Sequence, residues 1–410
     1  MKLVQINPVL RRSTSTGRIM EEIGDTMMAD GWECYAAYSR GRDGLMPTRM
    51  IPLPVGNIIS IALHGLTTRL FDRHGLASYS STVAFVKALK EINPDIVHIH
   101  NIHGYFLNYK LLFEYLSEYN KKVVWTVHDC WLYTGHCYYY SAAGCDKWKT
   151  GCGHCPQRLR FPKSLMYDRS ARNFIDKKRA FTSIPRKNMV IVPVSQWMRD
   201  EMRESFLSDY PFRVIHNGID TDVFAPRDSA DVIKKYNLSD AKTIILGLAS
   251  IWLKEKGLDD FKEMSHMLKE GERIVLVGVD DTTRKLLPKN IVAIRRTDNV
   301  GELAALYSAA TAFVNPTWQD NYPTVNLEAQ ACGTPVVTYR TGGSPESLTA
   351  DTGIVVEQGD VAGLLAAVRA FAARPAEPLA EACREHAVTN FRKQDRYSEY
   401  KTLYNKLLNS

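Results

Sequence analysis

Short apolar segments alternate with amphipathic segments along almost the whole chain, and this alternation limits the fold more than any other feature. In the first half, the strand-like segments 2–7 and 95–100 lie on either side of 18–30, where apolar residues recur at helical spacing. In the second half, the strand-like segments 243–249 and 335–339 are also separated by helix-like stretches. Strands that alternate with helices predict parallel sheets covered by helices on both faces.

The length of the chain indicates that this pattern forms two domains. The chain has 410 residues, and a single core rarely grows beyond about 250–300 residues. The two alternating series, 1–195 and 213–390, are similar in size, so the sequence predicts an α/β protein with two Rossmann-like domains. Ligands of such sheets bind beyond the carboxyl ends of the strands, so we expect the active site in a cleft between the domains.

Composition excludes several classes of protein. Hydrophobic residues make up 45% and charged residues 24% of the chain, which excludes a disordered or a polytopic membrane protein. The net charge is +7, but basic runs such as 177–179 are short, so we expect no nucleic-acid partner. Only Leu3–Ile6 separate Lys2 from Asn7, too few for a secretory signal. We therefore expect a cytoplasmic protein, with peripheral contact to the inner membrane left open.

The stretch 315–337 carries the strongest functional signal. Asp320 lies in a polar loop before a helix-like segment, and Glu328 lies two turns into that segment. The free amides of a helix N-terminus suit a phosphate or sugar hydroxyls. A capped helix with two solvated carboxylates is the alternative.

This stretch resembles glycosyltransferase family 4, in which two Glu residues are separated by seven residues and followed by A-x-A-x-G-x-P-V-V. Glu328 and the residues after it match, and Asp320 stands at the first Glu. The resemblance implies a GT-B fold with two facing domains, a donor-sugar contact from Asp320 and a ribose contact from Glu328. It places the intervening loop in the donor site as well: Asn321, Tyr322, Pro323 and Thr324.

Two further segments of the second half resemble the same family. Asn217-Gly218-Ile219-Asp220 with Phe224 matches its N-G-I-D-x-x-x-F motif, which adds Asn217 and Gly218 to the expected donor site. That match also accounts for Asp220-Thr221-Asp222, so we do not interpret these residues as a D-x-D metal motif.

Lys256-Gly257 matches the end of the family's G-R-x…K-G pattern, whose cations neutralise the donor diphosphate. The family's Arg is absent, because Ser250-Ile251 occupy that region. Lys254, Arg12 or Arg18 is expected to replace it.

Two segments of the first half complete the expected site. The run 13–18, with Ser15, Thr16, Gly17 and Arg18, resembles the S-T-G-R loop of a bacterial capsule and exopolysaccharide subset, and is expected to bind acceptor or phosphate with Gly17 allowing close approach. His128 lies at the carboxyl end of a strand and matches the family's T-x-H, which implies a contact with the donor sugar near the reacting centre. We expect Asp129 to orient His128 and to raise its pKa.

Four cysteines cluster within an insertion at about 130–160: Cys137, Cys145, Cys152 and Cys155. In a cytoplasmic protein these thiols favour a closed, structural zinc site. Disulfides and unliganded thiols are the alternatives.

The resemblance implies a retaining glycosyltransferase of the colanic-acid type that needs no cofactor for catalysis. It would move a sugar from a UDP- or GDP-linked donor, held by the second domain, to a glycan or lipid-linked acceptor on the first. His128, Asp320 and Lys256 are the expected catalytic residues, and the C-terminal helix 391–408 is expected to pack on the first domain. A sugar-nucleotide epimerase and a non-catalytic nucleotide-sugar-binding protein are the alternatives.

Overall fold

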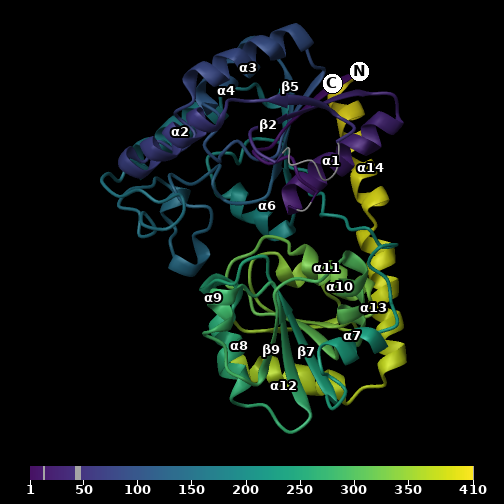
Figure 1. The fold of residues 1–410 in the computed structure, drawn as a ribbon. Coiled ribbons are helices and arrows are strands. Elements are labelled where there is room, and N and C mark those ends of the chain that lie inside the picture. Colours follow the sequence, from purple (N-terminus) through teal and green to yellow (C-terminus); the bar gives the residue numbers. More distant parts are fainter. Residues whose placement is uncertain (13, 42–47, 410) are drawn as a thin grey trace. The chain divides into compact units, whose positions relative to one another are not determined.

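A computed structural model describes residues 1–12, 14–41 and 48–409 of the chain. The chain forms two compact units (Figure 1). The first unit comprises Met1–His216 with Arg396–Ser410, and the second comprises Asn217–Asp395. Among the helices of the described residues, none is long and apolar enough to cross a bilayer.

The first unit is a six-stranded parallel sheet in the order β3-β2-β1-β4-β5-β6. This is the strand order of a Rossmann fold, with its switch point between β1 and β4. The strands are β1 (Lys2–Ile6), β2 (Glu33–Tyr38), β3 (Ile51–Pro54), β4 (Ile96–Ile99), β5 (Lys122–Val127) and β6 (Met189–Pro193). The helices are α1 (Ser15–Ala29), α2 (Ile58–Phe71), α3 (Tyr79–Ile92), α4 (Tyr109–Glu118), α5 (Ser170–Phe181), α6 (Gln196–Arg203) and most of α14 (Lys393–Leu408).

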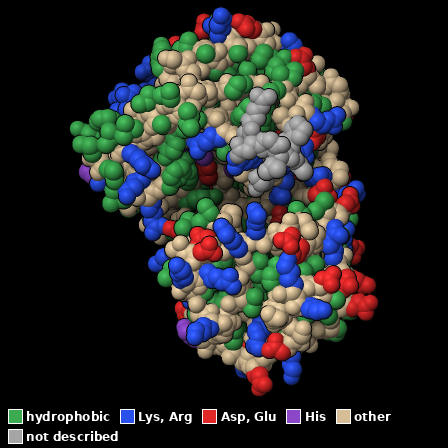
Figure 2. Space-filling model, viewed as in Figure 1, with side chains coloured by type: hydrophobic (Ala, Val, Ile, Leu, Met, Phe, Trp, Pro, Cys, Tyr) green, Lys and Arg blue, Asp and Glu red, His purple; other side chains and the backbone are tan. Residues whose placement is uncertain are grey.

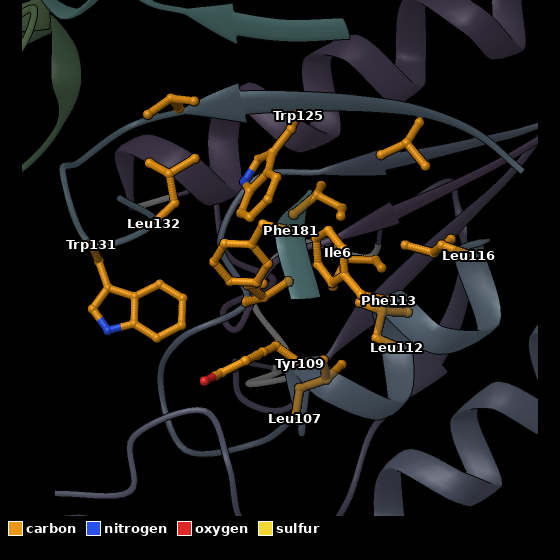
Figure 3. Packing of buried hydrophobic residues seen from close by; sticks show 14 of the residues in the cluster. Ile6, Leu107, Tyr109, Leu112, Phe113, Leu116, Trp125, Trp131, Leu132 and Phe181 are labelled. Carbon is orange, nitrogen blue, oxygen red and sulfur yellow. The ribbon is translucent and has the colours of Figure 1, made fainter. Parts of the chain in front are cut away.

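Aromatic packing holds β5 in place in this unit (Figure 3). The rings of Phe113, Trp125 and Phe181, from α4, β5 and α5, lie with their centroids 4.7–5.3 Å apart. All three side chains are buried. Their packing fixes the strand that His128 follows.

The C-terminal helix α14 packs on the sheet of the first unit beside α1 (Figure 1). The Tyr404 hydroxyl lies 2.6 Å from Nδ1 of His98, and the Tyr400 hydroxyl lies 2.9 Å from Oγ1 of Thr126. Both tyrosines are buried. The last helix therefore forms part of the support for β4 and β5.

The second unit repeats the same topology. Its six parallel strands have the order β12-β11-β10-β7-β8-β9, so the switch point lies between β7 and β10. The strands are β7 (Thr243–Leu248), β8 (Glu272–Val277), β9 (Ile291–Ile294), β10 (Ala312–Asn315), β11 (Val336–Tyr339) and β12 (Gly353–Val356). The helices are α7 (Ala230–Lys235), α8 (Leu258–Ser265), α9 (Asp281–Arg284), α10 (Val300–Ala309), α11 (Thr324–Ala331), α12 (Val361–Ala372) and α13 (Ala376–Phe391).

Candidate functional site

The switch point of the second unit brings together two loops that are far apart in the sequence. The loop 249–257 follows β7, and the loop 316–323 follows β10. The two strands are parallel neighbours, with Ile245 opposite Ala312. Both loops therefore leave the same edge of the sheet, which is where Rossmann-like sheets bind ligands.

Lys256 and Asp320 form an ion pair between these loops. Nζ of Lys256 lies 2.7 Å from Oδ2 of Asp320. Oδ1 of Asp320 accepts a hydrogen bond of 2.9 Å from the backbone N–H of Asn321. The two side chains are 39% and 19% exposed, so both charges remain accessible to a ligand.

A glycine permits this close approach of the two loops. Gly257 has a φ of +75°, and a Cβ atom there would overlap with Pro316. Next to it, the carbonyl of Glu255 accepts hydrogen bonds from the backbone N–H of Trp318 (2.9 Å) and from Oγ1 of Thr317 (3.2 Å). Residue 257 must therefore tolerate both a left-handed backbone and backbone contact, which favours glycine.

Trp318 anchors the second loop to the core of the unit. Its indole N–H donates to Oδ2 of Asp260 at 3.0 Å, and Oδ1 of the same carboxylate accepts from the hydroxyl of Tyr339 at 2.7 Å. Asp260 is buried, so both oxygens need such donors. This anchor limits the movement of the segment that carries Asp320.

A buried polar network holds the first turn of α11. Nδ2 of Asn326 donates to Ser344 and Ser347 at 3.0 and 3.1 Å, and its Oδ1 accepts from Asn315 at 2.9 Å. No side chain caps the helix start at Pro323. The first amides of α11 are thus held in a fixed direction at the end of β10, as an anion site at a helix N-terminus requires.

The other expected donor residues are mostly buried. Asn321 and Tyr322 are 2% and 4% exposed, whereas Thr324 is partly exposed. Glu328 is 5% exposed, and its Oε2 lies 3.4 Å from the Tyr307 hydroxyl. Asn217 donates from Nδ2 to the carbonyl of Tyr322 at 3.5 Å, so the 217–218 segment touches the loop that carries Asp320.

Asp220 is held by other residues of its own unit. Its carboxylate accepts from Nζ of Lys393 at 2.6 Å and from the backbone N–H groups of Asp222 and Val223. Burial opposes ionisation, but these donors lower the pKa of Asp220. The carboxylate ties the start of the second unit to the residue that begins α14.

The three candidates for the missing cation have different surroundings. Lys254 is exposed and lies on the same short turn as Lys256 (Lys254–Lys256). Arg12 is paired with Glu21 and Asp25 within the first unit. Arg18 lies in the first turn of α1. Of the three, Lys254 alone shares the loop that carries Lys256.

His128 in the first unit ends a chain of buried hydrogen bonds. Nε2 of Gln5 donates to the carbonyl of Met20, so Oε1 of Gln5 accepts from Nε2 of His100 at 3.0 Å. Burial keeps His100 neutral, so its Nδ1 accepts from Nε2 of His128 at 3.2 Å. In neutral His128 the proton therefore lies on Nε2, and Nδ1 is unprotonated.

The expectation that Asp129 orients His128 is wrong, whereas the Asp129 charge does act to raise the pKa of His128, as expected. Oδ2 of Asp129 lies 2.7 Å from Nε2 of His103, and Oδ1 accepts from the backbone N–H of Trp131. Burial lowers the pKa of His128 to about 4, which outweighs the opposite effect of the Asp129 charge. His128 is therefore neutral at pH 7. Gln5 and His103 received no role from the sequence; Gln5 lies within β1 and His103 in the loop after β4, near the carboxyl ends of these strands.

The expected acceptor loop is the first turn of α1. Ser15 begins the helix, and Oγ1 of Thr16 lies 3.4 Å from Nδ2 of Asn7. A Cβ atom on Gly17 would overlap with the Arg11 carbonyl and with Thr14, so the chain's own loop fills this space. Ser13, at the start of the motif, lies outside the described residues.

The structure does not support the zinc site. Cys137, Cys145, Cys152 and Cys155 surround one small pocket, and all four thiols are free. Within the part of the chain that the structure describes, no group of three or more His, Cys, Asp or Glu side chains could hold a metal ion.

Polar side chains order this insertion instead. The buried Lys177 donates from Nζ to the carbonyls of Trp131 (2.6 Å) and Thr134 (2.9 Å), and burial lowers its pKa to about 7. Buried Asp72 lies 2.7 Å from Nδ1 of His136. Lys177 lies in α5 and Asp72 follows the end of α2, so these contacts connect the insertion to two helices outside it.

Comparisons with known proteins agree with this topology. The model of glycosyltransferase family 4 matches residues 16–223, more than half of the chain, and the model of glycosyl transferases group 1 matches residues 242–374. The chain is 26% identical over 305 residues to the putative colanic acid biosynthesis glycosyl transferase WcaC of Escherichia coli K12, covering 72% of each protein. It is 28% identical over 229 residues to N-acetyl-alpha-D-glucosaminyl L-malate synthase of Bacillus anthracis, covering 52% of this chain and 59% of the relative.

Solved glycosyltransferases share the fold over the whole chain. Sucrose-phosphate synthase of Thermosynechococcus elongatus superposes with a TM-score of 0.71 at 18% identity and 99% coverage of both chains. Anabaena Alr3699/HepE, solved in complex with UDP, superposes with a TM-score of 0.69 at 13% identity, covering 99% of this chain and 100% of that one. The chain belongs to glycosyltransferase family 4, and it is a glycosyltransferase enzyme with the GT-B fold.

Proposed function

We propose that this enzyme transfers a sugar, with retention of anomeric configuration, from a UDP- or GDP-linked donor to a lipid-linked or growing bacterial surface polysaccharide. The observation that carries the proposal is the accessible Lys256–Asp320 pair at the β7/β10 switch point. Alr3699/HepE, solved with UDP and with UDP-glucose, supports a nucleotide-sugar donor. WcaC, named for colanic acid biosynthesis, supports a polysaccharide product.

The second unit binds the donor in this proposal. The Lys256 ammonium and the first amides of α11 stabilise the charge that develops on the departing diphosphate. Asp320 orients the donor sugar, and Glu328 binds the ribose. Lys254 supplies the second positive charge, because it shares the loop of Lys256.

The first unit binds the acceptor, with the first turn of α1 contributing Ser15, Thr16 and Arg18. His128 contacts the donor sugar near the reacting carbon, as the resemblance to the family implies. The bond between C1 and the diphosphate oxygen breaks, and the acceptor oxygen bonds to C1 on the same face. The acceptor proton passes to the departing diphosphate. In this proposal the Lys256 ammonium and the amides of α11 stabilise that diphosphate, and the step requires no cofactor.

The acceptor determines where the enzyme acts. Because the proposed acceptor is lipid-linked, we place the enzyme in the cytoplasm, in peripheral contact with the inner face of the plasma membrane.

The first experiment measures thermal stabilisation by UDP, GDP and ADP separately. At a hundredfold excess over Kd, binding adds about 2.7 kcal/mol of stability. Stabilisation by UDP or GDP alone identifies the donor base, and sugars on that nucleotide are then incubated with glycan acceptors. Nucleotide release that depends on acceptor, with a retained anomeric bond by NMR, supports the proposal. An inverted bond refutes retention, conversion of the donor without acceptor indicates an epimerase, and binding without turnover indicates a non-catalytic protein.

A further inference from the structure

Helix α2 exposes its apolar side chains and buries polar ones. His64 and Thr68 are its buried residues. By contrast, Ile58, Ile59 and Leu63 are 82%, 66% and 58% exposed. A surface helix of a globular protein normally has the opposite arrangement.

Hydrogen bonds fix α2 in this orientation. His64 is buried, and its Nδ1 lies 2.8 Å from Oγ of Ser78. Its Nε2 accepts a hydrogen bond of 3.0 Å from the backbone N–H of Gly75. Asn57 and Ser60 cap the start of the helix reciprocally. Rolling the helix to bury its apolar side chains would break these contacts, so the apolar face stays outward.

A second exposed apolar segment adjoins the end of α2. The backbone N–H of Leu165 donates to the carbonyl of Arg69 at 2.7 Å, and the rings of Phe71 and Tyr167 stack at 5.7 Å. The large side chains of this segment are 49–63% exposed: Leu159, Phe161, Leu165, Met166 and Tyr167. We call α2 and residues 158–167 together the apolar face.

Charge on the apolar face is mostly positive. The segments 56–71 and 156–167 contain no Asp or Glu. Of the two carboxylates directly next to them, Asp72 is buried, and Asp168 accepts from the backbone N–H groups of Cys155 and Ser170. Exposed or partly exposed cations lie on or next to the segments: Arg69, Arg73, Arg158, Arg160 and Lys163. Figure 2 shows hydrophobic side chains beside Lys and Arg where Figure 1 places α2. Apolar side chains interspersed with cations complement a surface of acyl chains under anionic headgroups.

We infer that the apolar face docks the first unit on an anionic lipid bilayer. The exposed Ile and Leu side chains of α2 and the aromatic side chains of 158–167 enter the headgroup boundary, while the cations meet lipid phosphates. A folded unit that exposed so many adjacent apolar side chains to water would be an aggregation hazard, unless a surface covers them. The inference gives the proposed function its access to a lipid-linked acceptor and rests on that function for its purpose. Its physical basis is the apolar face alone.

The test is flotation with vesicles that contain no acceptor. Vesicles of phosphatidylcholine alone are compared with vesicles of equal parts phosphatidylcholine and phosphatidylglycerol. We expect the full-length enzyme to float with the anionic vesicles, and the variant Ile58→Ser/Ile59→Ser/Leu63→Ser to bind them at least tenfold more weakly. The variant Arg73→Gln/Lys163→Gln should lose most of the preference for anionic vesicles.

The matched control removes exposed apolar side chains from the second unit. Leu286 and Val300 are 62% and 47% exposed, so Leu286→Ser/Val300→Ser should float like the unmodified enzyme. Equal flotation of the α2 variant and this control would overturn the inference. So would an enzyme that ignores both vesicle types, or one that self-associates in solution through α2 without binding vesicles. Each variant is also melted with UDP and GDP, so a failure of lipid binding is distinguished from a failure of the proposed donor site.

Discussion

Replacing Lys256 by alanine should reduce catalysis far more than stability. Its ion pair with Asp320 is short, at 2.7 Å, but the two side chains are 39% and 19% exposed. Ion pairs that are accessible to water contribute about 0–1 kcal/mol to folding. A single donor that stabilises developing negative charge contributes about 2.7–4 kcal/mol to catalysis, or 10²–10³ in kcat.

The assay measures both quantities on the same protein. Urea unfolding followed by fluorescence gives the free energy of unfolding, and acceptor-dependent release of the nucleotide diphosphate gives kcat and KM. We expect Lys256→Ala to lose no more than about 1 kcal/mol of stability, while kcat falls at least about a hundredfold. A change confined to KM would mean that Lys256 binds the donor equally in ground and transition states.

Lys262→Ala is the matched control. Lys262 lies one turn into α8, and its Nζ is 3.1 Å from Asp259 on the protein surface. We expect this variant to change stability by no more than about 0.5 kcal/mol and to leave turnover unchanged. A fall in kcat of less than tenfold for Lys256→Ala, with the nucleotide still bound, would refute the role assigned to Lys256.

Three further outcomes follow from the same structure. Gly257→Ala should lose at least about 2 kcal/mol of unfolding free energy, since the left-handed backbone alone costs about 1–2 kcal/mol. Gly271→Ala is the control, because its φ is +81° but a Cβ atom there would meet only a flexible lysine side chain. Urea midpoints should show a smaller loss of stability for Gly271→Ala than for Gly257→Ala. Glu328→Gln should abolish the thermal stabilisation by UDP or GDP, and an unchanged stabilisation would remove Glu328 from the donor site. Burial lowers the pKa of His64 and His128 to about 4, below the unfolded value of about 6.5. Stability should therefore be complete above pH 6.5 and fall as the pH drops towards 4, by up to about 1.4 kcal/mol per pH unit for each histidine. Urea midpoints that stay flat between pH 6.5 and 4 would contradict the neutral histidines.

The sheets could be predicted from the sequence because their strands are continuous apolar runs. The expected strands 243–249 and 335–339 correspond to β7 (Thr243–Leu248) and β11 (Val336–Tyr339). Strands of a parallel sheet are covered by helices on both faces, so their sequences are continuous apolar runs. The order of the strands depends on crossover connections, which an apolar run does not encode.

Helix α2 could not be placed from its pattern. The stretch 57–66 is plainly apolar, but a periodicity argument assumes that apolar residues face the core. Here His64 and Thr68 face inward. His64 is held by Ser78 and Gly75, which lie beyond the end of the helix, so the pattern predicts neither the helix nor its orientation.

The resemblance supplied Lys256 and Asp320 separately, and the fold explains why they meet. They are 64 residues apart in sequence, and their contact depends on β7 and β10 being parallel neighbours at a switch point. Local spacing cannot predict such a contact. The same holds for Asn326, whose partners Ser344 and Ser347 lie beyond the next strand.

Asp129 does not orient His128 because the two side chains meet different partners. β5 ends at Val127, and the chain bends at Asp129. His128 lies against His100, whereas Asp129 contacts His103 and the backbone N–H of Trp131. Adjacency in sequence suggested a pair that the loop after β5 does not form.

The two units place different electrostatics at their strand ends, and this difference bears on the chemistry. The loops after β7 and β10 carry an accessible ammonium and carboxylate, together with the uncapped start of α11. After β4 and β5 the first unit instead holds His100 and His128, both kept neutral by burial. A diphosphate leaving group needs charged and dipolar donors to stabilise its negative charge. The neutral imidazoles of the first unit supply no positive charge, whereas Lys256 and the first amides of α11 do, so the electrostatics favour the diphosphate of the donor on the second unit.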